Sequence, residues 1–393
     1  FMTYSLSKKT LTFKKYWDVK FREEDRSFNS YSSELSNLLE DAVKKRLMSD
    51  VPYGAYLSGG VDSGTIVSAM ILNSGSSKPI KTFSVGFKQE EHSELKEARK
   101  LALQLKTDHH ELIIDEKCLS ELPNLVYQSD EPLADPTAIP VYFLSKYAKK
   151  YCTVILTGEG ADELFAGYPQ YNFMSMRNSI LNKFPKYIRK KLPVIAELVP
   201  SSLKNKMFKF SSDLGEKGII RLSDFLTSNN SDNQYLSLIS IFDESEQKRL
   251  GLPRFTEEFY KSLNLKEHKN KSIVSACQLF ELKNSMVEDL LMKVDKNTMA
   301  YGVEGRVPFL DHRVVELAAK IPLKYKMNGY LKNKIILRHV SKKFVPIETA
   351  TRKKKHFFVP IVEWVEKDLM PLRKKLLSKS WFQHHPLSPS ILD

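Results

Sequence analysis

The chain has 393 residues, a length that permits a large hydrophobic core and suggests two or three domains or lobes. Its hydrophobic fraction of 42% is typical of a globular protein, and no apolar run approaches the ~18 residues that a membrane helix needs. The first residues lack the apolar centre of a signal peptide, and the three cysteines are too scattered for a zinc site or a redox motif. We therefore expect a soluble, cytoplasmic protein with buried free thiols and no membrane partner.

The formal net charge of +14 is accompanied by lysine-rich stretches. Such a surface suits an anionic partner, for example a nucleic acid or an acidic carrier protein, but a solvated protein face has the same composition. The stretches lack the interleaved aromatic residues of single-stranded nucleic-acid sites. A solvated face is therefore the better interpretation, and a nucleic-acid partner is not expected. The stretches lie at residues 183–191, 204–209, 352–355 and 373–375.

Apolar periodicity predicts an amphipathic helix at residues 30–48, followed by alternating strands and helices. The predicted strands lie at 54–57, 80–87, 110–114 and 153–156, and the predicted helices at 63–73, 92–105, 118–128 and 138–150. This alternation predicts an α/β fold with a twisted parallel sheet, helices on both faces, and ligands bound beyond the carboxyl ends of the strands. After residue 180 the pattern changes, and we expect a mostly helical C-terminal half that packs closely against the first.

A glycine-containing loop follows the first predicted strand, with the sequence Ser58-Gly-Gly-Val-Asp-Ser63. Gly59 and Gly60 let the backbone approach a ligand closely, and the start of the next helix points N–H groups at it, an arrangement that suits pyrophosphate. Ser58 and Ser63 add hydroxyl donors, and Asp62 is a candidate magnesium ligand. The alternative is an ordinary glycine turn in which Asp62 or Ser63 caps the helix. The loop is not a Walker motif, because no Gly-Lys-Ser/Thr occurs in the chain.

A second loop follows the strand predicted at 153–156 and begins Thr157-Gly-Glu-Gly-Ala-Asp-Glu. Gly158 and Gly160 permit a tight turn, and Glu159, Asp162 and Glu163 are able to bind metal or move a proton. Together with Asp62 they predict a magnesium site between two strand ends. The alternative is that these acidic residues only cap the following helix, and for Glu163 the two interpretations are evenly balanced.

With both loops in view, the sequence resembles the synthetase domain of glutamine-hydrolysing asparagine synthetases. The matching stretches occur in family order over about residues 15 to 365. They are Tyr56-Leu-Ser-Gly-Gly-Val-Asp-Ser63, Phe83-Ser-Val-Gly-Phe87, Asp130-Glu-Pro-Leu-Ala-Asp-Pro-Thr-Ala-Ile-Pro140, Thr157–Tyr168, Val294-Asp-Lys-Asn-Thr-Met299 and Glu304-Gly-Arg-Val-Pro-Phe-Leu-Asp-His312.

The resemblance implies an ATP-pyrophosphatase fold of the adenine nucleotide alpha hydrolase type, which uses ATP and Mg²⁺. It implies that aspartate or another carboxylate is adenylated and that ammonia then gives asparagine, AMP and pyrophosphate. Two alternatives remain open. The same adenylation chemistry acts on a sugar-acid or peptide carboxylate, or the chain is a non-catalytic relative that binds a polyanion or a partner. A homodimer is a further option that the sequence leaves open.

The resemblance also assigns roles to single residues. The nucleotide-contacting positions are Leu57, Val85, Thr157 and Gly158, the first two beside adenine, and residues 58–63 are implied to hold pyrophosphate. The implied magnesium ligands are Asp62 and Asp162. Glu159 lies where asparagine synthetases have the glutamate that assists ammonia attack, whereas relatives that close β-lactam rings have tyrosine.

Three further candidates come from the C-terminal half. Glu304 and Arg306 are implied to lie at the acceptor side of the cleft, with a structural ion pair as the alternative. Lys334 matches a lysine that neutralises charge on the phosphates. Lys332 competes with it for this role, because the sequence here departs from the usual family pattern.

Two departures from the family limit what the resemblance implies. In 352–360 the usual glutamine and glycine are lost and His356 replaces the glycine, so the acceptor pocket is expected to be reshaped or closed. Residues 1–20 resemble the tail and linker of a missing glutaminase domain. The nucleophile of that domain is its N-terminal cysteine, and Phe1 cannot take this role. We therefore expect an α/β core at 21–180, a helical continuation at 181–393 that completes the acceptor site, and ammonia from a missing domain, a partner chain or solution.

Overall fold

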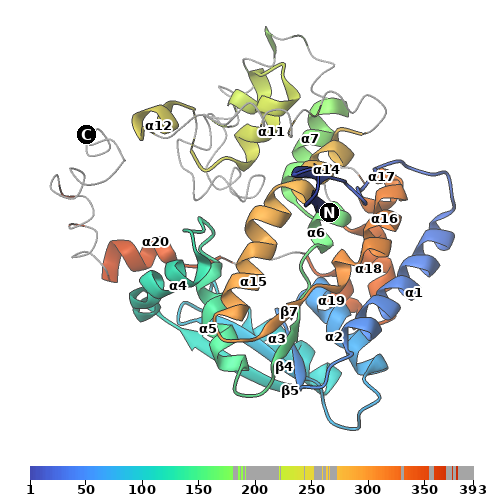
Figure 1. Ribbon diagram of the computed structural model, residues 1–393, viewed down its shortest axis with the longest axis vertical. Helices are drawn as coiled ribbons and strands as arrows, with labels where there is room; N and C mark the ends of the chain where they lie inside the picture. Colours follow the sequence, from blue (N-terminus) through green and yellow to red (C-terminus); the bar gives the residue numbers. More distant parts are fainter. Residues whose placement is uncertain are drawn as a thin grey trace.

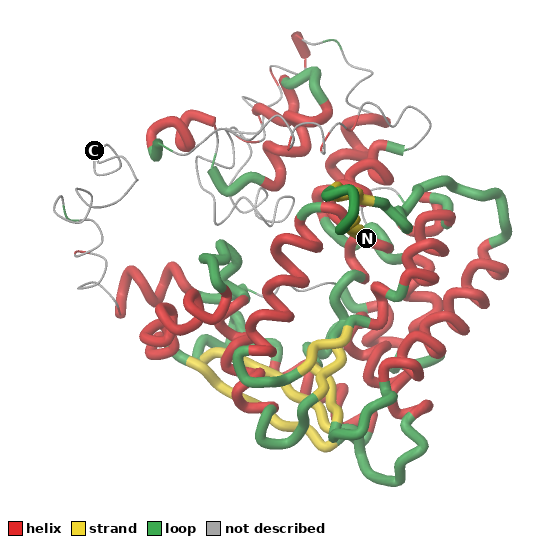
Figure 2. Tube along the Cα trace, viewed as in Figure 1, coloured by secondary structure: helices red, strands yellow, loops and turns green. Residues whose placement is uncertain are grey.

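The computed structural model describes residues 1–179, 223–242, 244–251, 272–328, 332–353 and 358–368, together with scattered single positions between and beyond these ranges. A parallel sheet lies at one end of the molecule and helices surround it, as Figures 1 and 2 show.

Five strands form this sheet in the order β5-β4-β3-β6-β7, and every neighbouring pair is parallel. The chain therefore moves from central β3 outward to β4 and β5, and then returns to the other side of β3 for β6. Such a reversal of strand order opens a crevice at the carboxyl ends of the two central strands. The strands are β3 (Tyr53–Tyr56), β4 (Lys81–Phe87), β5 (Asp108–Ile114), β6 (Val154–Leu156) and β7 (Glu304–Arg306).

The predicted α/β fold is confirmed, although some boundaries shift. The first helices are α1 (Phe28–Arg46), α2 (Val61–Asn73), α3 (Leu95–Leu105), α4 (Leu122–Ser129) and α5 (Ala138–Ala148). Residues 92–94, predicted as helix, form the loop before α3, and a 3-10 turn, η1 (Glu116–Glu121), precedes α4. The strand β7 is the main element that was not predicted, because a three-residue strand is too short to show a period of two.

Alternating side chains of the strands pack against helices on opposite faces of the sheet. Ala55, Val154 and Leu156 belong to the largest core cluster, which includes buried residues of α1 and α2. Phe83 and Ile155 belong to another cluster, with Leu144 and Ala148 of α5. Both faces of the central strands are covered, and the central strand β6 is apolar at every position, as is typical of buried parallel strands.

The C-terminal half is mostly helical in its described parts, as predicted. Its larger elements are α7 (Pro169–Ser179), α11 (Ser231–Ile239), α14 (Ile273–Lys283), the π-helical turn η4 (Met286–Leu291), α15 (Met292–Met299), α16 (His312–Lys320) and α18 (Ile335–Ser341). Shorter helices are α6 (Ala161–Leu164), α12 (Glu244–Arg249), α17 (Leu323–Lys326), α19 (Ile347–Thr351) and α20 (Ile361–Glu363). The two halves pack closely, since α1 contacts α16 and α18, and α15 lies along α5 (Figure 1).

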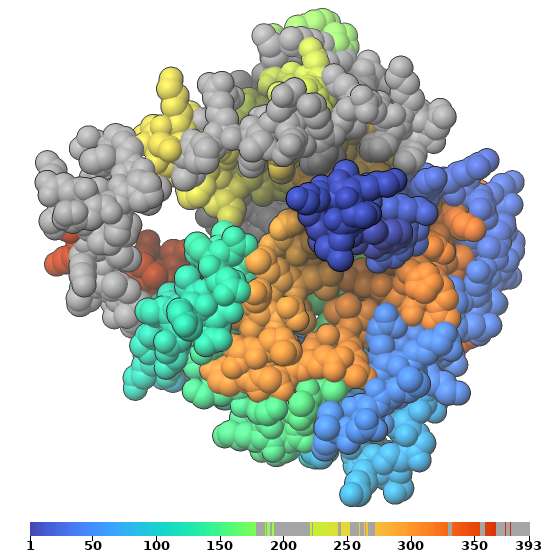
Figure 3. Space-filling model, in the orientation of Figure 1, coloured from blue at the N-terminus to red at the C-terminus, as the bar shows by residue number. Residues whose placement is uncertain are grey.

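The first residues form a separate antiparallel hairpin of β1 (Met2–Ser5) and β2 (Thr10–Phe13). Figure 3 shows this dark-blue hairpin on the molecular surface. The chain then joins the main body, because Val19 and Phe21 are buried in the largest core cluster. The proposed boundaries at residues 20 and 180 stay predictions.

Several features of the sequence fall wholly or partly outside the described residues. They are most of the lysine-rich stretches at 183–191 and 373–375, the whole of 204–209, and Lys354 to Phe357 with the replacement His356. Cys118, Cys152 and Cys277 are free and buried, as expected. Among the described helices, none combines the length and the apolar character that crossing a bilayer requires.

Candidate functional site

The loop after β3 is folded tightly at the start of α2. Gly59 has a φ of +74°, and a Cβ there would lie only 2.6 Å from the backbone carbon of Glu97. The Ser58 and Ser63 hydroxyls are 3.1 Å apart, and the Ser58 N–H also donates to the Ser63 hydroxyl at 3.2 Å. Gly60 is the N-cap residue of α2 and adds no side-chain cap. The loop therefore brings small polar groups and a helix N-terminus together, as an anion site requires.

The loop after β6 lies directly against the first loop. A Cβ on Gly158 would lie 2.9 Å from the Ser63 nitrogen, so only glycine fits at this contact. The Thr157 N–H donates to the Arg306 carbonyl at 2.9 Å, which extends the ladder between β6 and β7. Gly160 has a φ of +93° and starts α6. The sheet thus brings together the two loops that the sequence identified separately.

Lys334 joins both loops from the other half of the chain. Its side chain is buried, and its Nζ lies 2.7 Å from Asp62 Oδ2 and 2.7 Å from Asp162 Oδ1. Burial alone would lower the pKa of Lys334, but the Asp162 and Asp62 carboxylates outweigh it and raise the pKa above its usual value. The amine therefore stays a cation at neutral pH. Lys332, the rival for this role, is exposed.

The residues present fit a magnesium ion and phosphate groups. Asp62 Oδ1 and Thr157 Oγ1 are buried and have no hydrogen-bond partner in the part of the chain that the structure describes. A Cβ on Gly167 would lie 2.0 Å from Asp162 Oδ1 and 2.1 Å from Lys334 Cε, so glycine is what leaves room for this cluster. Carboxylate oxygens are preferred ligands of Mg²⁺, and an unsatisfied buried oxygen is costly without a ligand.

Glu163 lies behind the site and not in it. Its side chain is buried and accepts a hydrogen bond from the Tyr168 hydroxyl, and its backbone carbonyl accepts one from Gln278. Burial, with Asp162 nearby, raises the pKa of Glu163 to about 8. A carboxyl group that is protonated at neutral pH and held by a tyrosine is a poor metal ligand. Neither helix capping nor metal binding describes this residue, which is part of a buried hydrogen-bond network.

A buried ion pair that the sequence analysis missed lies beside Glu159. Lys293 Nζ lies 2.7 Å from Asp135 Oδ2 and 2.9 Å from the Thr137 hydroxyl. Burial would lower the pKa of Lys293, but the Glu159 and Asp135 carboxylates raise it overall. The available signal was weak, because Lys293 directly precedes the matching stretch that begins at Val294, in a chain rich in lysine.

Leu57 and Val85 lie at the carboxyl ends of neighbouring strands. The Leu57 N–H donates to the Phe83 carbonyl at 2.9 Å, and the Ser84 hydroxyl donates to the Leu57 carbonyl. Leu57 is buried and Val85 is partly buried. These positions agree with an apolar wall beside the glycine loop, and their contact with adenine stays a prediction.

Glu304 and Arg306 form an ion pair on the edge strand β7, with 2.7 Å between Arg306 Nε and Glu304 Oε1. Arg306 also donates to the Arg46 and Met48 carbonyls, at 2.7 and 2.8 Å, just where α1 ends. Arginine satisfies orphan carbonyls of a helix C-terminus in this way. These contacts agree with the alternative that Glu304 and Arg306 form a structural ion pair. An additional role at the acceptor side stays a prediction.

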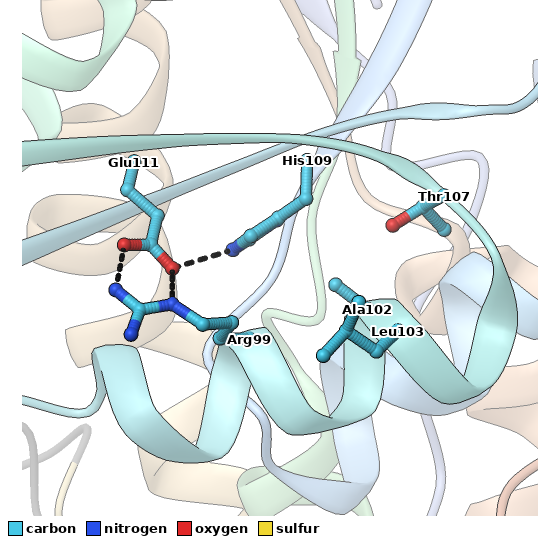
Figure 4. A pocket seen from close by; sticks show the side chains of 6 residues that line it. All are labelled: Arg99, Ala102, Leu103, Thr107, His109 and Glu111. Carbon is cyan, nitrogen blue, oxygen red and sulfur yellow. Dashed lines mark hydrogen bonds and ion pairs between the residues drawn. The ribbon is translucent and has the colours of Figure 1, made fainter.

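A surface pocket lies between α3 and β5 (Figure 4). Its lining includes none of Lys334, Asp62 and Asp162. In it, Arg99 makes a bidentate pair with Glu111, and His109 lies between Glu111 and Thr107 (Figure 4). His109 Nδ1 lies 2.9 Å from the Thr82 hydroxyl, so this ring is held by the sheet. The pocket lies beside the edge strand β5. Strand β4 separates β5 from β3, whose following loop belongs to the site.

Comparisons with known proteins agree with this geometry. The family model for asparagine synthase matches residues 34–390. Asparagine synthetase [glutamine-hydrolyzing] 1 of Bacillus subtilis is 35% identical over 376 residues, which cover 94% of this chain and 56% of that protein. A putative asparagine synthetase of Mycobacterium tuberculosis is 31% identical, covering 84% and 48%. Amidase chyE of Penicillium rubens is 27% identical, covering 93% and 58%.

The chain therefore spans about half the length of the curated relatives it matches. The shared part contains the two glycine loops and the lysine that joins them. On this match, this chain belongs to the asparagine synthase family.

Proposed function

We propose that this chain is the synthetase part of an ATP-dependent amide-forming ligase. It adenylates the side-chain carboxylate of aspartate and transfers ammonia to give asparagine, AMP and pyrophosphate. The observation that carries the proposal is the position of Lys334, which contacts Asp62 and Asp162 where the loops after β3 and β6 meet. Two carboxylates, a buried cation and a helix N-terminus at one point suit a nucleotide triphosphate with its metal ion.

In the first step, an acceptor carboxylate oxygen attacks the α-phosphorus of ATP. The bond from this phosphorus to the bridging oxygen breaks, and pyrophosphate leaves with the bonding electrons. Lys334 and the N–H groups of residues 58–63 stabilise the charge that grows on the leaving group. Mg²⁺, held by Asp62 and Asp162, would supply further charge neutralisation when bound.

In the second step, the ammonia nitrogen attacks the acyl carbon of the adenylate. The bond from this carbon to the phosphate-bearing oxygen breaks, AMP leaves, and the nitrogen loses a proton. We assign Glu159 as the base that accepts this proton, because it directly follows Gly158 in the second loop. Lys293, held by Asp135, keeps a positive charge near Glu159.

The test measures magnesium-dependent pyrophosphate release with ATP, ammonium chloride and one carboxylate at a time. Aspartate is expected to give the highest kcat/KM. A higher kcat/KM with a sugar acid or a peptide carboxylate would make that compound the acceptor instead. Ammonium chloride supplies the ammonia in this assay. Asp62→Asn is expected to abolish turnover while circular dichroism stays unchanged. Turnover at the wild-type rate in that variant would contradict the magnesium assignment. No pyrophosphate release with any acceptor would contradict the proposed function.

A cytoplasmic location belongs to the same proposal.

A further inference from the structure

Two arginines lie close to the glycine loop without a carboxylate partner. Arg352 follows α19, and Arg338 lies on α18, one turn after Lys334. Among the residues that the structure describes, no carboxylate lies within ion-pair distance of either side chain. The carboxylates nearby pair with other cations: Asp62 and Asp162 with Lys334, and Glu348 with Lys100. The hydrogen bonds that both guanidinium groups donate go to backbone carbonyls, so their positive charges stay available to an anion.

Arg352 is attached to the glycine loop itself. One of its terminal nitrogens, Nη1, donates to the Gly59 carbonyl at 3.0 Å. Its helix, α19, packs on α2, since a Cβ on Gly64 would lie 3.8 Å from Thr349. The Arg352 guanidinium is therefore held near the N-terminus of α2, which already carries the positive end of the helix dipole. The Arg352 cation and the positive end of the helix dipole both favour an anion bound in the loop.

Arg338 holds Arg352 in place through backbone carbonyls. Its Nη1 lies 2.8 Å from the Ala350 carbonyl and 2.8 Å from the Arg352 carbonyl, and its Nε lies 3.1 Å from the Asn333 carbonyl. One side chain therefore connects the residue before Lys334 with the residue that reaches Gly59. Arg338 therefore ties together the two segments that carry the Lys334 and Arg352 cations.

We propose that Arg352 binds the pyrophosphate portion of ATP together with Lys334, and that Arg338 is the positioning residue that holds Arg352 at the loop. The inference rests on the proposed function and adds a binding residue to it. A guanidinium that reaches a loop backbone is geometrically suited to phosphate oxygens, which it contacts with paired N–H groups. The contact exists only with the two outer phosphates, so it distinguishes ATP and pyrophosphate from AMP.

The test compares equilibrium binding of ATP, pyrophosphate and AMP in the presence of magnesium, for wild type, Arg352→Gln and Arg352→Lys. Arg352→Gln is expected to weaken ATP and pyrophosphate binding about 10- to 100-fold, the usual loss for a hydrogen bond to a charged group, and to leave AMP binding unchanged. Arg352→Lys is expected to recover part of the loss, because it restores the charge without the bidentate geometry. Arg99→Gln, which removes a surface arginine paired with Glu111, is the matched control and is expected to bind all three ligands as wild type does.

Arg338→Lys is the second variant, and it is expected to weaken ATP binding by less than Arg352→Gln, again without a change for AMP. Equal losses for ATP and AMP in Arg352→Gln would show a purely structural role and overturn the proposal. Unchanged ATP binding in Arg352→Gln would also overturn the role of Arg352. In that case the proposed function would still stand, because the wild-type chain would bind ATP. A wild-type chain that binds neither ATP nor pyrophosphate would overturn both.

Discussion

The Nζ atom of Lys334 lies 2.7 Å from the carboxylate of Asp62, although 272 residues separate them in the chain. The same Nζ lies 2.7 Å from Asp162, so one cation joins both acidic loops. Two carboxylates that contact the same atom repel each other, and the buried ammonium between them compensates this repulsion. The C-terminal half thus completes a site that the α/β core begins.

Lys334→Met removes this cation while keeping much of the side-chain volume. The activity is expected to fall roughly 100- to 1000-fold, because the transition state loses a buried donor to the leaving phosphates. Lys332→Met is the matched control, since Lys332 is exposed two residues away, and its rate is expected to stay within about twofold of wild type. Steady-state pyrophosphate release measures both variants. The reverse order of effects would transfer the role to Lys332.

Glu159→Gln separates the two chemical steps. Glutamine cannot accept the ammonia proton, so asparagine formation is expected to fall about 100-fold or more. Adenylation does not need this base, so aspartate-dependent exchange of labelled pyrophosphate into ATP is expected to continue near the wild-type rate. An equal loss of both activities would place Glu159 in nucleotide binding and not in ammonia attack.

Gly167→Ala tests the packing of the acidic cluster. The new methyl group would lie 2.0 Å from Asp162 Oδ1 and 2.1 Å from Lys334 Cε, so both side chains have to move. We expect a loss of about 1–3 kcal/mol in unfolding free energy together with a large loss of activity. Gly75→Ala is the control, because a Cβ there meets nothing within 4 Å and only its φ of +60° adds strain. Thermal unfolding and turnover are measured for both, and full activity in Gly167→Ala would contradict the described geometry.

Glu163→Gln tests the buried carboxyl group. The pKa of Glu163 is raised to about 8, against 4.5 for a free glutamate, so the folded state keeps a proton that the unfolded state loses. Wild-type stability is therefore expected to fall between about pH 4.5 and 8 through this group, and the fall ends above its folded pKa. Glutamine still accepts the Tyr168 hydrogen bond without this cost. The variant is thus expected to gain stability relative to wild type as pH rises through this range, measured by denaturant unfolding. A difference that does not change with pH would contradict the raised pKa.

The α/β core was predictable because its signals are local. Strands β3 and β6 are short apolar runs, and α2 begins directly after two glycines, so these elements and the loop between β3 and α2 are visible in a short window. The meeting of Asp62 and Asp162 also followed, since parallel strands place their carboxyl ends at one edge.

The remaining part of the site depends on contacts between distant segments. Nothing near Lys334 distinguishes it from Lys332 in sequence, and only burial separates them. Lys293 and Asp135 are 158 residues apart, and neither has a local pattern that indicates the pair. Arg306 donates to carbonyls at the end of α1, a contact between distant segments that no spacing in the sequence predicts.

The most direct test of the proposed chemistry follows an oxygen atom. Aspartate labelled with ¹⁸O in its side-chain carboxylate is incubated with the chain, ATP, magnesium and ammonium, and the products are examined by mass spectrometry. Adenylation predicts asparagine, AMP and pyrophosphate in equal amounts, with one ¹⁸O in the phosphate of each AMP. Label in inorganic phosphate with ADP as the nucleotide product, or AMP without label, would contradict the adenylation mechanism.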